Sequence, residues 1–264
     1  TSPVFVAHFE KFAAEAAKRF GLGADSLVVD IGSNDGILLR PFKKRGARVL
    51  GIEPDRTIAA LARKAGIPTT PKFFSAAVAR KIRARHGRAD LVTATNVFAH
   101  INKIHEVARG VKLLLKKDGV FMIEVPHLLD LLTHNLFDTV YHEHLSYFSV
   151  GALKAFFDSV GMELFDVEKV PTHGGSLRVF AQRKGAARPK TDALSALLRR
   201  EKRGRLTECA TYEAYARRIG ENRAKLIALL TSLRRRGKRI AGYGAPAKGN
   251  TLLNFFGIGT DLTA

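Results

Sequence analysis

The densest group of chemically reactive side chains lies at residues 141–144, where Tyr141, His142, Glu143 and His144 follow one another. A neutral imidazole can remove a proton near pH 7. A neighbouring carboxylate can orient such a base, and a tyrosine hydroxyl can stabilise an oxyanion. The group therefore predicts acid–base chemistry.

Two other interpretations of this group stay open. The first is a metal site, but three close ligands would need a fourth, and the single cysteine, Cys209, supplies no cysteine cluster. We therefore expect no metal. The second is a structural role, in which the histidines are packed and hydrogen-bonded. A chain with one cysteine forms no internal disulfide, which fits a reducing, cytoplasmic setting.

A second group of functional interest lies at residues 27–36, Leu-Val-Val-Asp-Ile-Gly-Ser-Asn-Asp-Gly. The apolar run at 27–31 predicts a buried strand, and Gly32 and Gly36 predict a tight turn before a helix. Glycines let the backbone approach a ligand closely, and the free N–H groups at a helix start favour a polar ligand. The stretch predicts a nucleotide-type cofactor site, with an ordinary strand-to-helix turn as the alternative.

The acidic residues near this turn narrow the choice of cofactor. Glu53 ends a predicted strand at 48–52, where a carboxylate can accept hydrogen bonds from ribose hydroxyls. The turn does not match Gly-x-Gly-x-x-Gly, and Asp30 and Asp35 would repel a diphosphate. They suit a cationic ligand such as S-adenosylmethionine, which carries a sulfonium, an ammonium and a ribose but no phosphate.

The first half of the chain alternates predicted strands with predicted helices, which is typical of an α/β fold with a doubly wound parallel sheet. One of these helices, at 105–115, is expected to be closed by residues 117–119. Further on, 162–170 and 176–182 predict an antiparallel strand pair at the sheet edge. Residues 1–184 are therefore expected to form one domain.

The last third of the chain has a different pattern. Residues 185–236 predict a helical connector that follows a Gly- and Pro-containing linker. Residues 239–244 repeat the opening theme of a short strand and glycines, so 237–264 are expected to begin a second Rossmann-like domain. We expect that both ends of this sequence are cut from a longer protein.

The acid-Ile-Gly-x-x-x-Gly turn, followed by a glutamate after the second strand, resembles class I methyltransferases. Asp90, at the start of the fourth strand, and Asn96 and Val97 beyond its end sit where that family lines its methyl-transfer pocket. The resemblance implies a site for S-adenosylmethionine. The residues expected to bind this cofactor are Asp30, Gly32, Ser33, Asn34, Gly36, Glu53, Pro54, Asn96 and Val97.

Three separated motifs resemble the nucleotide-sugar C-methyltransferases of deoxysugar biosynthesis. They are residues 138–148, 174–179 (Gly-Gly-Ser-Leu-Arg-Val) and 242–251. The resemblance implies methylation at C3 of a nucleotide-linked 4-keto-deoxysugar. That family typically has an N-terminal cysteine-rich zinc domain, which is missing here, so zinc is expected only in such a domain.

The same resemblance implies roles for individual side chains. His144 matches the family's general base, which would remove the proton next to the ketone. Tyr141 and Glu143 match its neighbours and would hold the enolate oxygen and orient the base. His100 matches a further active-site histidine, whereas His142 is expected to be structural. The enolate carbon would then attack the sulfonium methyl group.

Four residues are expected to contact the substrate. Ser176 and Arg178 would face it from a strand, although an arginine there is often a solvated edge residue. Lys248 and Asn250 lie in a glycine turn that opens a helix, a natural place for phosphate or sugar hydroxyls. A turn that only contacts another domain is the alternative for this pair.

The net charge of +20 suggests a polyanionic partner, but its distribution argues otherwise. Residues 188–239 hold 16 Lys and Arg against 5 Asp and Glu, which favours a solvated helix surface over nucleic acid. No apolar run reaches transmembrane length. The expected partner is a nucleotide-diphosphate sugar, and we expect a monomer with no membrane. Methylation of RNA or another small molecule, or a non-catalytic cofactor-binding fragment, are the competing functions.

Overall fold

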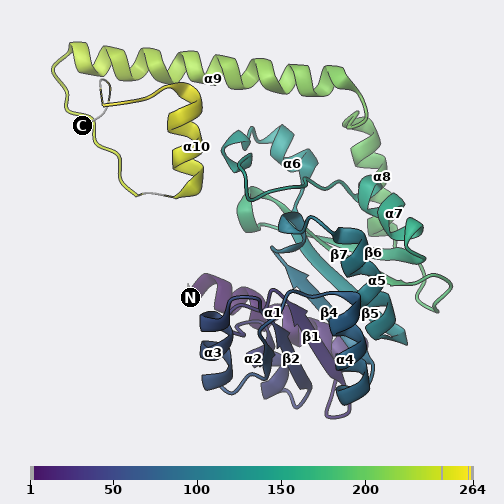
Figure 1. The fold of residues 1–264 in the computed structure, drawn as a ribbon. Coiled ribbons are helices and arrows are strands. Elements are labelled where there is room, and N and C mark those ends of the chain that lie inside the picture. Colours follow the sequence, from purple (N-terminus) through teal and green to yellow (C-terminus); the bar gives the residue numbers. More distant parts are fainter. Residues whose placement is uncertain (1–2, 245, 261, 263–264) are drawn as a thin grey trace.

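The computed structural model describes residues 3–244, 246–260 and 262, and Figure 1 shows their arrangement. A seven-stranded sheet forms its centre, with the strand order β3-β2-β1-β4-β5-β7-β6. The strands are β1 (Leu27–Ile31), β2 (Arg48–Ile52), β3 (Thr69–Thr70), β4 (Ala89–Thr95), β5 (Leu115–Pro126), β6 (Met162–Val170) and β7 (Ser176–Arg183). The first five run parallel, and β7 is antiparallel to both β5 and β6. The predicted α/β class with an antiparallel edge pair is confirmed.

Helices cover both faces of the sheet, as a doubly wound fold requires. They are α1 (Pro3–Phe20), α2 (Leu39–Lys44), α3 (Arg56–Lys64), α4 (Ala76–His86), α5 (Ile104–Leu114), α6 (Leu128–Thr133), α7 (Val150–Ser159), α8 (Asp192–Arg203), α9 (Cys209–Arg235) and α10 (Ala247–Phe256). Side chains alternate along a strand. Val28 accordingly belongs to the apolar cluster that includes residues of α1 and α2, and Val29 belongs to the cluster on the other face, with residues of α4, α5, α7 and α8. This burial on both faces explains why β1 is apolar almost throughout.

The parallel strands bring several polar groups to one edge of the sheet. The glycine turn follows β1, Glu53 follows β2, Asn96 follows β4 and Pro126 closes β5. Carboxyl ends of neighbouring parallel strands share an edge, where ligands of open α/β sheets bind. The fold therefore gathers residues that are up to 96 positions apart, from 30 to 126.

Helix α8 packs against the domain that contains the sheet. Leu194 and Leu197 on α8 are buried in the same apolar cluster as β5 and α7. Helix α9 then extends away from the sheet, across the top of Figure 1, and α10 lies beside it. The helices in the described part of the chain include none that is long and apolar enough to cross a membrane.

Two local predictions are wrong. Residues 117–119 do not close a helix, because β5 already begins at Leu115; the strand pairs Ala89 with Leu115 and then shifts register, so that Leu91 pairs with Val120. This irregular start absorbs the extra residues as a bulge does. Residues 238–244 form no strand, since none of the described strands lies beside them to share backbone hydrogen bonds.

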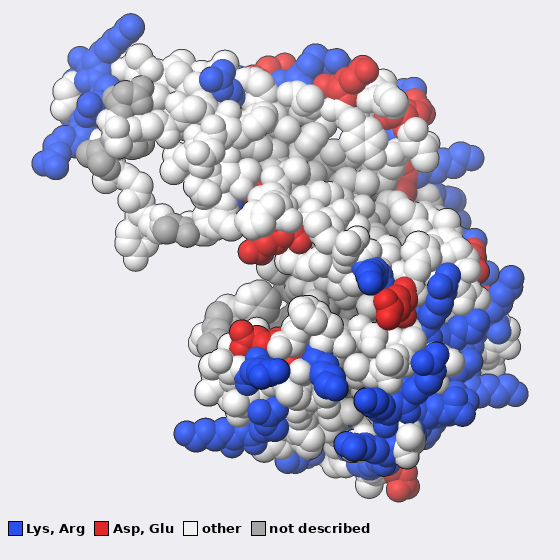
Figure 2. All heavy atoms as spheres, viewed as in Figure 1, with Lys and Arg blue, Asp and Glu red and all other residues white. Residues whose placement is uncertain are grey.

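Positive charge collects in two regions of the surface visible in Figure 2. One is the end of α9, where Arg234 and Arg235 lie, and the other is around α4, which carries Arg80, Lys81 and Arg83. The basic segment at 188–239 thus forms largely exposed helix surface, as its composition suggested.

Candidate active site

The turn after β1 is a close-packed backbone loop. Gly32, Asn34 and Gly36 all adopt positive φ angles, of 70°, 50° and 83°. Such angles suit glycine and, less well, asparagine. A Cβ atom on Gly32 would come within 2.8 Å of Val97 Cγ2, and one on Gly36 within 2.9 Å of Ile67 Cγ1. The glycines therefore let β1, β4 and the chain before β3 meet closely around this turn.

Glu53 fixes the shape of the turn. Its carboxylate accepts hydrogen bonds from the backbone N–H of Asn34 and that of Asp55, both at 3.0 Å. Each carboxylate oxygen can accept a second hydrogen bond. Glu53 can thus hold the turn and still face a hydroxyl-bearing ligand.

A cavity of about 540 Å³ opens beside this turn, and we call it the donor cavity. It brings together eight of the nine residues expected to bind the cofactor; they are Asp30, Gly32, Ser33, Asn34, Glu53, Pro54, Asn96 and Val97. Gly36 does not line it. Phe5 and Phe9 of α1 also line the donor cavity, which the sequence did not indicate.

A second cavity of about 560 Å³ joins the first around Gly32, Pro54 and Val97. Its lining includes Phe74 and Ser75, which sequence reasoning missed. They lie between β3 and α4, at the same edge of the sheet as the turn, so their position after a strand is the signal that could have found them. The donor cavity thus has several polar side chains in its lining, and the second cavity has more apolar ones.

Three polar groups in the donor cavity are buried, and two of them have no hydrogen-bond partner among the described residues. Ser33 Oγ and Asn96 Oδ1 are buried without a hydrogen-bond partner among the described residues. The Asp30 carboxyl accepts a hydrogen bond of 2.6 Å from Thr93 Oγ1. Burial raises the pKa of Asp30 to about 7; the Thr93 hydrogen bond opposes this rise and the charge of Glu53 adds to it. These groups are poised for a ligand that brings donors or positive charge.

A smaller cavity of about 190 Å³ lies next to the donor cavity, and we call it the acceptor cavity. Its lining is Asn96, Ala99, His100, Pro126, Thr139, Tyr141, His144, His173 and Lys248. Asn96 and His173 line both cavities. The structure thus brings His144, Tyr141, His100 and Lys248 together beside the expected cofactor site.

The tautomer of His144 follows from one contact. Its Nδ1 atom lies 2.7 Å from the Thr139 carbonyl oxygen, which can only accept, so Nδ1 carries the proton. In the neutral imidazole Nε2 is then the unprotonated nitrogen, which can act as a base. The ring centre of His144 lies 4.6 Å from that of Tyr141 and 4.9 Å from that of His100. Partial burial, and then the charge of His144, lower the pKa of His100.

Within the segment between β5 and α7, the part that follows α6 carries this chemistry and forms no further α-helix or strand. It contains one short turn, Phe137–Thr139, and Leu145 donates a backbone hydrogen bond of 2.9 Å to the Ala99 carbonyl. Tertiary contacts, and not a helix or strand, set its shape. That explains why the sequence of this segment shows no clean period.

Both ends of this segment are tied to one side chain on α8. The Glu201 carboxylate accepts hydrogen bonds from the backbone N–H groups of Val150, at 2.6 Å, and Gly151, at 2.9 Å. It also lies 2.9 Å from His127 Nε2. His127 is fully buried, and its Nδ1 atom lies 3.2 Å from the Asp130 carboxylate. We call this arrangement the Glu201 clamp.

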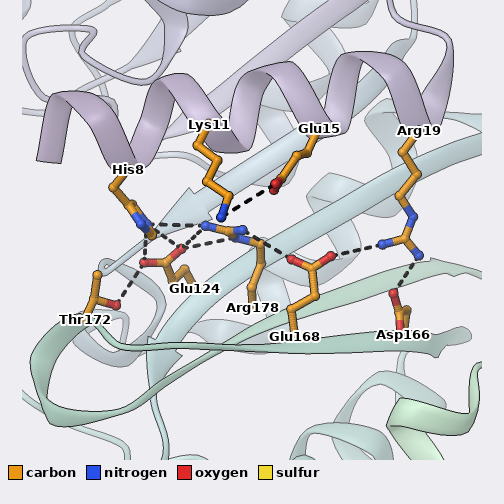
Figure 3. A network of polar contacts seen from close by, with 9 residues as sticks. All are labelled: His8, Lys11, Glu15, Arg19, Glu124, Asp166, Glu168, Thr172 and Arg178. Carbon is orange, nitrogen blue, oxygen red and sulfur yellow. Dashed lines mark hydrogen bonds and ion pairs between the residues drawn. The ribbon is translucent and has the colours of Figure 1, made fainter.

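Arg178 lies elsewhere, in the buried ion network of Figure 3. It pairs with Glu124 at 2.9 Å and Glu168 at 3.2 Å, and only 4% of its surface is exposed. It is therefore neither in the acceptor cavity nor at a solvated edge, because β6 lies outside β7 and α1 covers this face. Burial would raise the pKa of Glu124, but the hydrogen bond from His8 and the charge of Arg178 lower it overall.

Several other predicted residues do not reach the acceptor cavity. Ser176 is buried and donates a hydrogen bond of 2.9 Å to the Thr172 carbonyl. Asn250 is exposed and accepts from Asn254 on the same helix at 2.8 Å. Glu143 is exposed and acts on His100 and Tyr141 only through its charge. His142 is exposed as well.

The expectation for Asp90 is wrong. Its carboxylate pairs with Lys116 at 2.7 Å and accepts from the Leu27 backbone N–H at 2.8 Å. It therefore lies at the amino ends of β1 and β4, whereas both cavities lie at the carboxyl ends. The first residues of a strand lie at the opposite edge of the sheet from its last residues, so Asp90 cannot reach the cavities.

A family model described as a methyltransferase domain matches residues 5–167. The chain belongs to this methyltransferase family. A second model, described as a C-methyltransferase C-terminal domain, matches residues 171–264 of the methyltransferase.

Curated relatives are similar to different extents. The methyltransferase is 42% identical over 254 residues to C-methyltransferase NovU of Streptomyces niveus, across 96% of this chain and 60% of NovU. The chain thus spans about three fifths of that relative's length. It is 30% identical over 116 residues to a ubiquinone biosynthesis O-methyltransferase of Rhodopseudomonas palustris (strain HaA2), across 41% of this chain and 46% of that protein.

Solved structures confirm the fold. PH0226 protein from Pyrococcus horikoshii OT3 matches with a TM-score of 0.56 at 15% identity, covering 70% of this chain and 93% of that one. Magnesium protoporphyrin IX methyltransferase from Synechocystis PCC 6803, solved with bound SAH, matches with a TM-score of 0.53 at 15% identity. The match covers 68% of this chain and 84% of that one. The methyltransferase thus has the class I, Rossmann-like fold.

S-adenosylmethionine is the cofactor that this family and fold imply, and the residues present fit it. The unpaired acceptor Asn96 Oδ1 and the carboxyl groups of Asp30 and Glu53 suit its positive charge and its ribose. The apolar cavity at Phe74 suits an aromatic base. Bound there, the cofactor supplies an electrophilic methyl group.

The pKa of Asp30 gives a first prediction. Affinity for S-adenosylmethionine should rise by roughly tenfold between about pH 6 and about pH 8, because Asp30 ionises near pH 7 and its charge then attracts the cation. Isothermal titration at both pH values measures this change. Asp30→Asn should remove most of the pH dependence, and a wild-type affinity independent of pH would contradict the assignment.

The same group affects stability with a defined sign. Asp30 keeps its proton up to about pH 7 in the folded protein, whereas the ordinary pKa of an aspartate is 3.8. The folded state therefore binds more protons between these values, so the free energy of unfolding should fall as pH rises through this range. Asp30→Asn should be more stable than the wild type at about pH 8, which urea unfolding can test.

Proposed function

We propose that this methyltransferase adds a methyl group to the carbon next to the ketone of a nucleotide-linked 4-keto-deoxysugar, at C3. The observation that carries the proposal is the free Nε2 of His144, fixed by the Thr139 carbonyl in a small cavity beside the donor cavity. Carbon methylation needs such a base, since a C–H bond next to a ketone must lose its proton before the carbon can attack. The likeness to C-methyltransferase NovU supports the same reaction class.

The residues of the acceptor cavity would have different roles in the proposed reaction. His144 Nε2 would take the proton from the carbon, and the electron pair of that C–H bond would move toward the ketone oxygen. Tyr141, whose ring lies against His144, would donate its hydroxyl proton in a hydrogen bond to that oxygen. The carbon then forms a bond to the methyl group as the bond between methyl and sulfur breaks, which leaves the neutral thioether.

Lys248 supports a charged or hydroxyl-rich substrate. It lies near the start of α10 and lines the acceptor cavity, although it is more than 100 positions from His144 in the sequence. Phe137 and Phe256 stack with ring centres 4.9 Å apart, which holds α10 against the segment that carries His144. The C-terminal region thus contributes to the proposed substrate site.

The test is a product analysis with the complete protein, S-adenosylmethionine and a thymidine-diphosphate 4-keto-deoxysugar. We expect mass spectrometry to show one added methyl group, and deuterium labelling to place it on the carbon next to the ketone. The matching 4-hydroxy sugar, which has no acidic C–H bond, is the control and should not react. Methylation of RNA with strong salt dependence, and none of the sugar, would contradict the proposal.

A further inference from the structure

His173 stands where the two cavities meet. It lies in the turn Thr172–Gly174 between β6 and β7, and it lines both the donor cavity and the acceptor cavity. A methyl group that passes from one cavity to the other must cross this boundary. Among the described residues, Asn96 is the one other residue that lines both cavities.

The backbone of His173 is strained. Its φ angle is 55° and its ψ angle is 27°, in the left-handed region that a histidine seldom occupies. Gly174 and Gly175 follow with φ angles of 81° and 132°. Strain of this kind persists when the surrounding structure enforces it, and it often marks a functional position.

Contacts on both sides enforce this turn. Thr172 Oγ1 donates to the buried Glu124 carboxylate at 3.3 Å, within the network of Figure 3. The Thr172 carbonyl accepts from Ser176 Oγ at 2.9 Å. On the other side, a Cβ atom on Gly175 would come within 2.6 Å of Asp130 Oδ2. Contacts with two carboxylates thus hold the turn from both sides and keep the backbone at His173 in place.

The ring of His173 is free to bind a ligand. It packs near Phe5, with ring centres 6.1 Å apart, and neither ring nitrogen has a hydrogen-bond partner among the described residues. Loss of water around the ring, and then the charge of Lys248, lower the pKa of His173, so the neutral imidazole with one N–H predominates at pH 7. In contrast to His144, this ring has no carbonyl that fixes it as a base.

We propose that His173 is a further catalytic residue, which donates a ring N–H hydrogen bond to the ketone oxygen of the acceptor while His144 removes the proton. Negative charge develops on that oxygen, and a second donor beside Tyr141 would stabilise it. The proton stays on His173 throughout, and the electron pair returns from the oxygen when the new carbon–carbon bond forms. This role rests on the proposed function.

The experiment separates deprotonation from methyl transfer. The complete protein is incubated with the thymidine-diphosphate 4-keto-deoxysugar and S-adenosylhomocysteine in D₂O, and mass spectrometry follows deuterium uptake next to the ketone. S-adenosylhomocysteine has no methyl group to give, so uptake reports only the base and the oxyanion donors. Binding of S-adenosylhomocysteine is measured separately by calorimetry.

Two variants distinguish the side chain from the strained backbone. His173→Gly suits the positive φ angle but has no donor, whereas His173→Asn suits it and keeps an N–H donor. We expect His173→Gly to slow exchange by about 100-fold, the loss typical of one oxyanion donor, and His173→Asn to retain much of the rate. Both should bind S-adenosylhomocysteine as the wild type does and unfold at no lower temperature.

Different failures have different meanings. Exchange at the wild-type rate in His173→Gly would overturn the role of His173 alone. Equal losses of exchange and of S-adenosylhomocysteine binding in both variants would also overturn it, since the residue would then only support the fold. No exchange in the wild type would overturn the proposed substrate, and the role of His173 with it.

Discussion

Replacement of His144 by asparagine is expected to lower the rate of methyl transfer by about 10³-fold, while S-adenosylmethionine binds as before. General bases contribute roughly 10²–10⁴-fold to rates, and asparagine has no basic nitrogen. Its side chain can still reach the Thr139 carbonyl, which His144 Nδ1 contacts at 2.7 Å. The fold of the segment should therefore survive, so the loss can be assigned to the base.

His142→Asn is the matched control for this experiment. His142 lies two positions away in the same segment and is exposed. The same substitution there should leave the rate nearly unchanged. Steady-state rates at saturating cofactor, together with calorimetric affinities, measure both variants. Full activity in His144→Asn, or an equal loss in His142→Asn, would refute the assignment of the base.

The second large effect concerns stability. Glu201→Ala is expected to lower the free energy of unfolding by about 3 kcal/mol, because it removes the acceptor of two backbone N–H groups and the partner of His127. The carboxylate is only 6% exposed, so water cannot replace it easily. Glu201→Gln keeps one carbonyl oxygen and should lose less.

Urea unfolding of the complete protein measures this change. Glu213→Ala on α9 is the control, since Glu213 is exposed and should shift the free energy of unfolding by less than about 0.5 kcal/mol. Glu201→Ala should also reduce kcat, because the segment that carries His144 would lose its fixed ends. A variant with wild-type stability would show that the Glu201 clamp does not hold the segment.

Local patterns predicted the parts of the site that local structure determines. The glycine turn was predictable because residues 27–36 hold a buried strand, positive-φ positions and a helix start within ten positions. Tyr141 and His144 were predictable because the reactive side chains are close in sequence. The fold class followed from the alternation of strands and helices.

The remainder depends on contacts between distant residues. No sequence pattern around His173 indicates a functional role. Its position in the site becomes visible only in the fold, where the turn between β6 and β7 lies beside the cavities. Arg178 shows the reverse case: its place on a strand was right, but the cover supplied by α1 could not be predicted. In the sequence Glu201 is one of many charged residues on a predicted helix. Only the folded structure shows that it contacts Val150, which lies 51 residues earlier.

The Glu201 clamp has a consequence for the order of events on the ribosome. Chains emerge with their N-terminal end first, and early segments start to fold while later ones are still being made. All strands in the described part of the chain end at or before Arg183, but the segment at 127–149 needs Glu201 to secure its ends. The nascent methyltransferase should therefore acquire its sheet before the segment that carries His144 is fixed in place. Until α8 has left the exit tunnel, the two N–H groups at the start of α7 and the ring of His127 would await their partner.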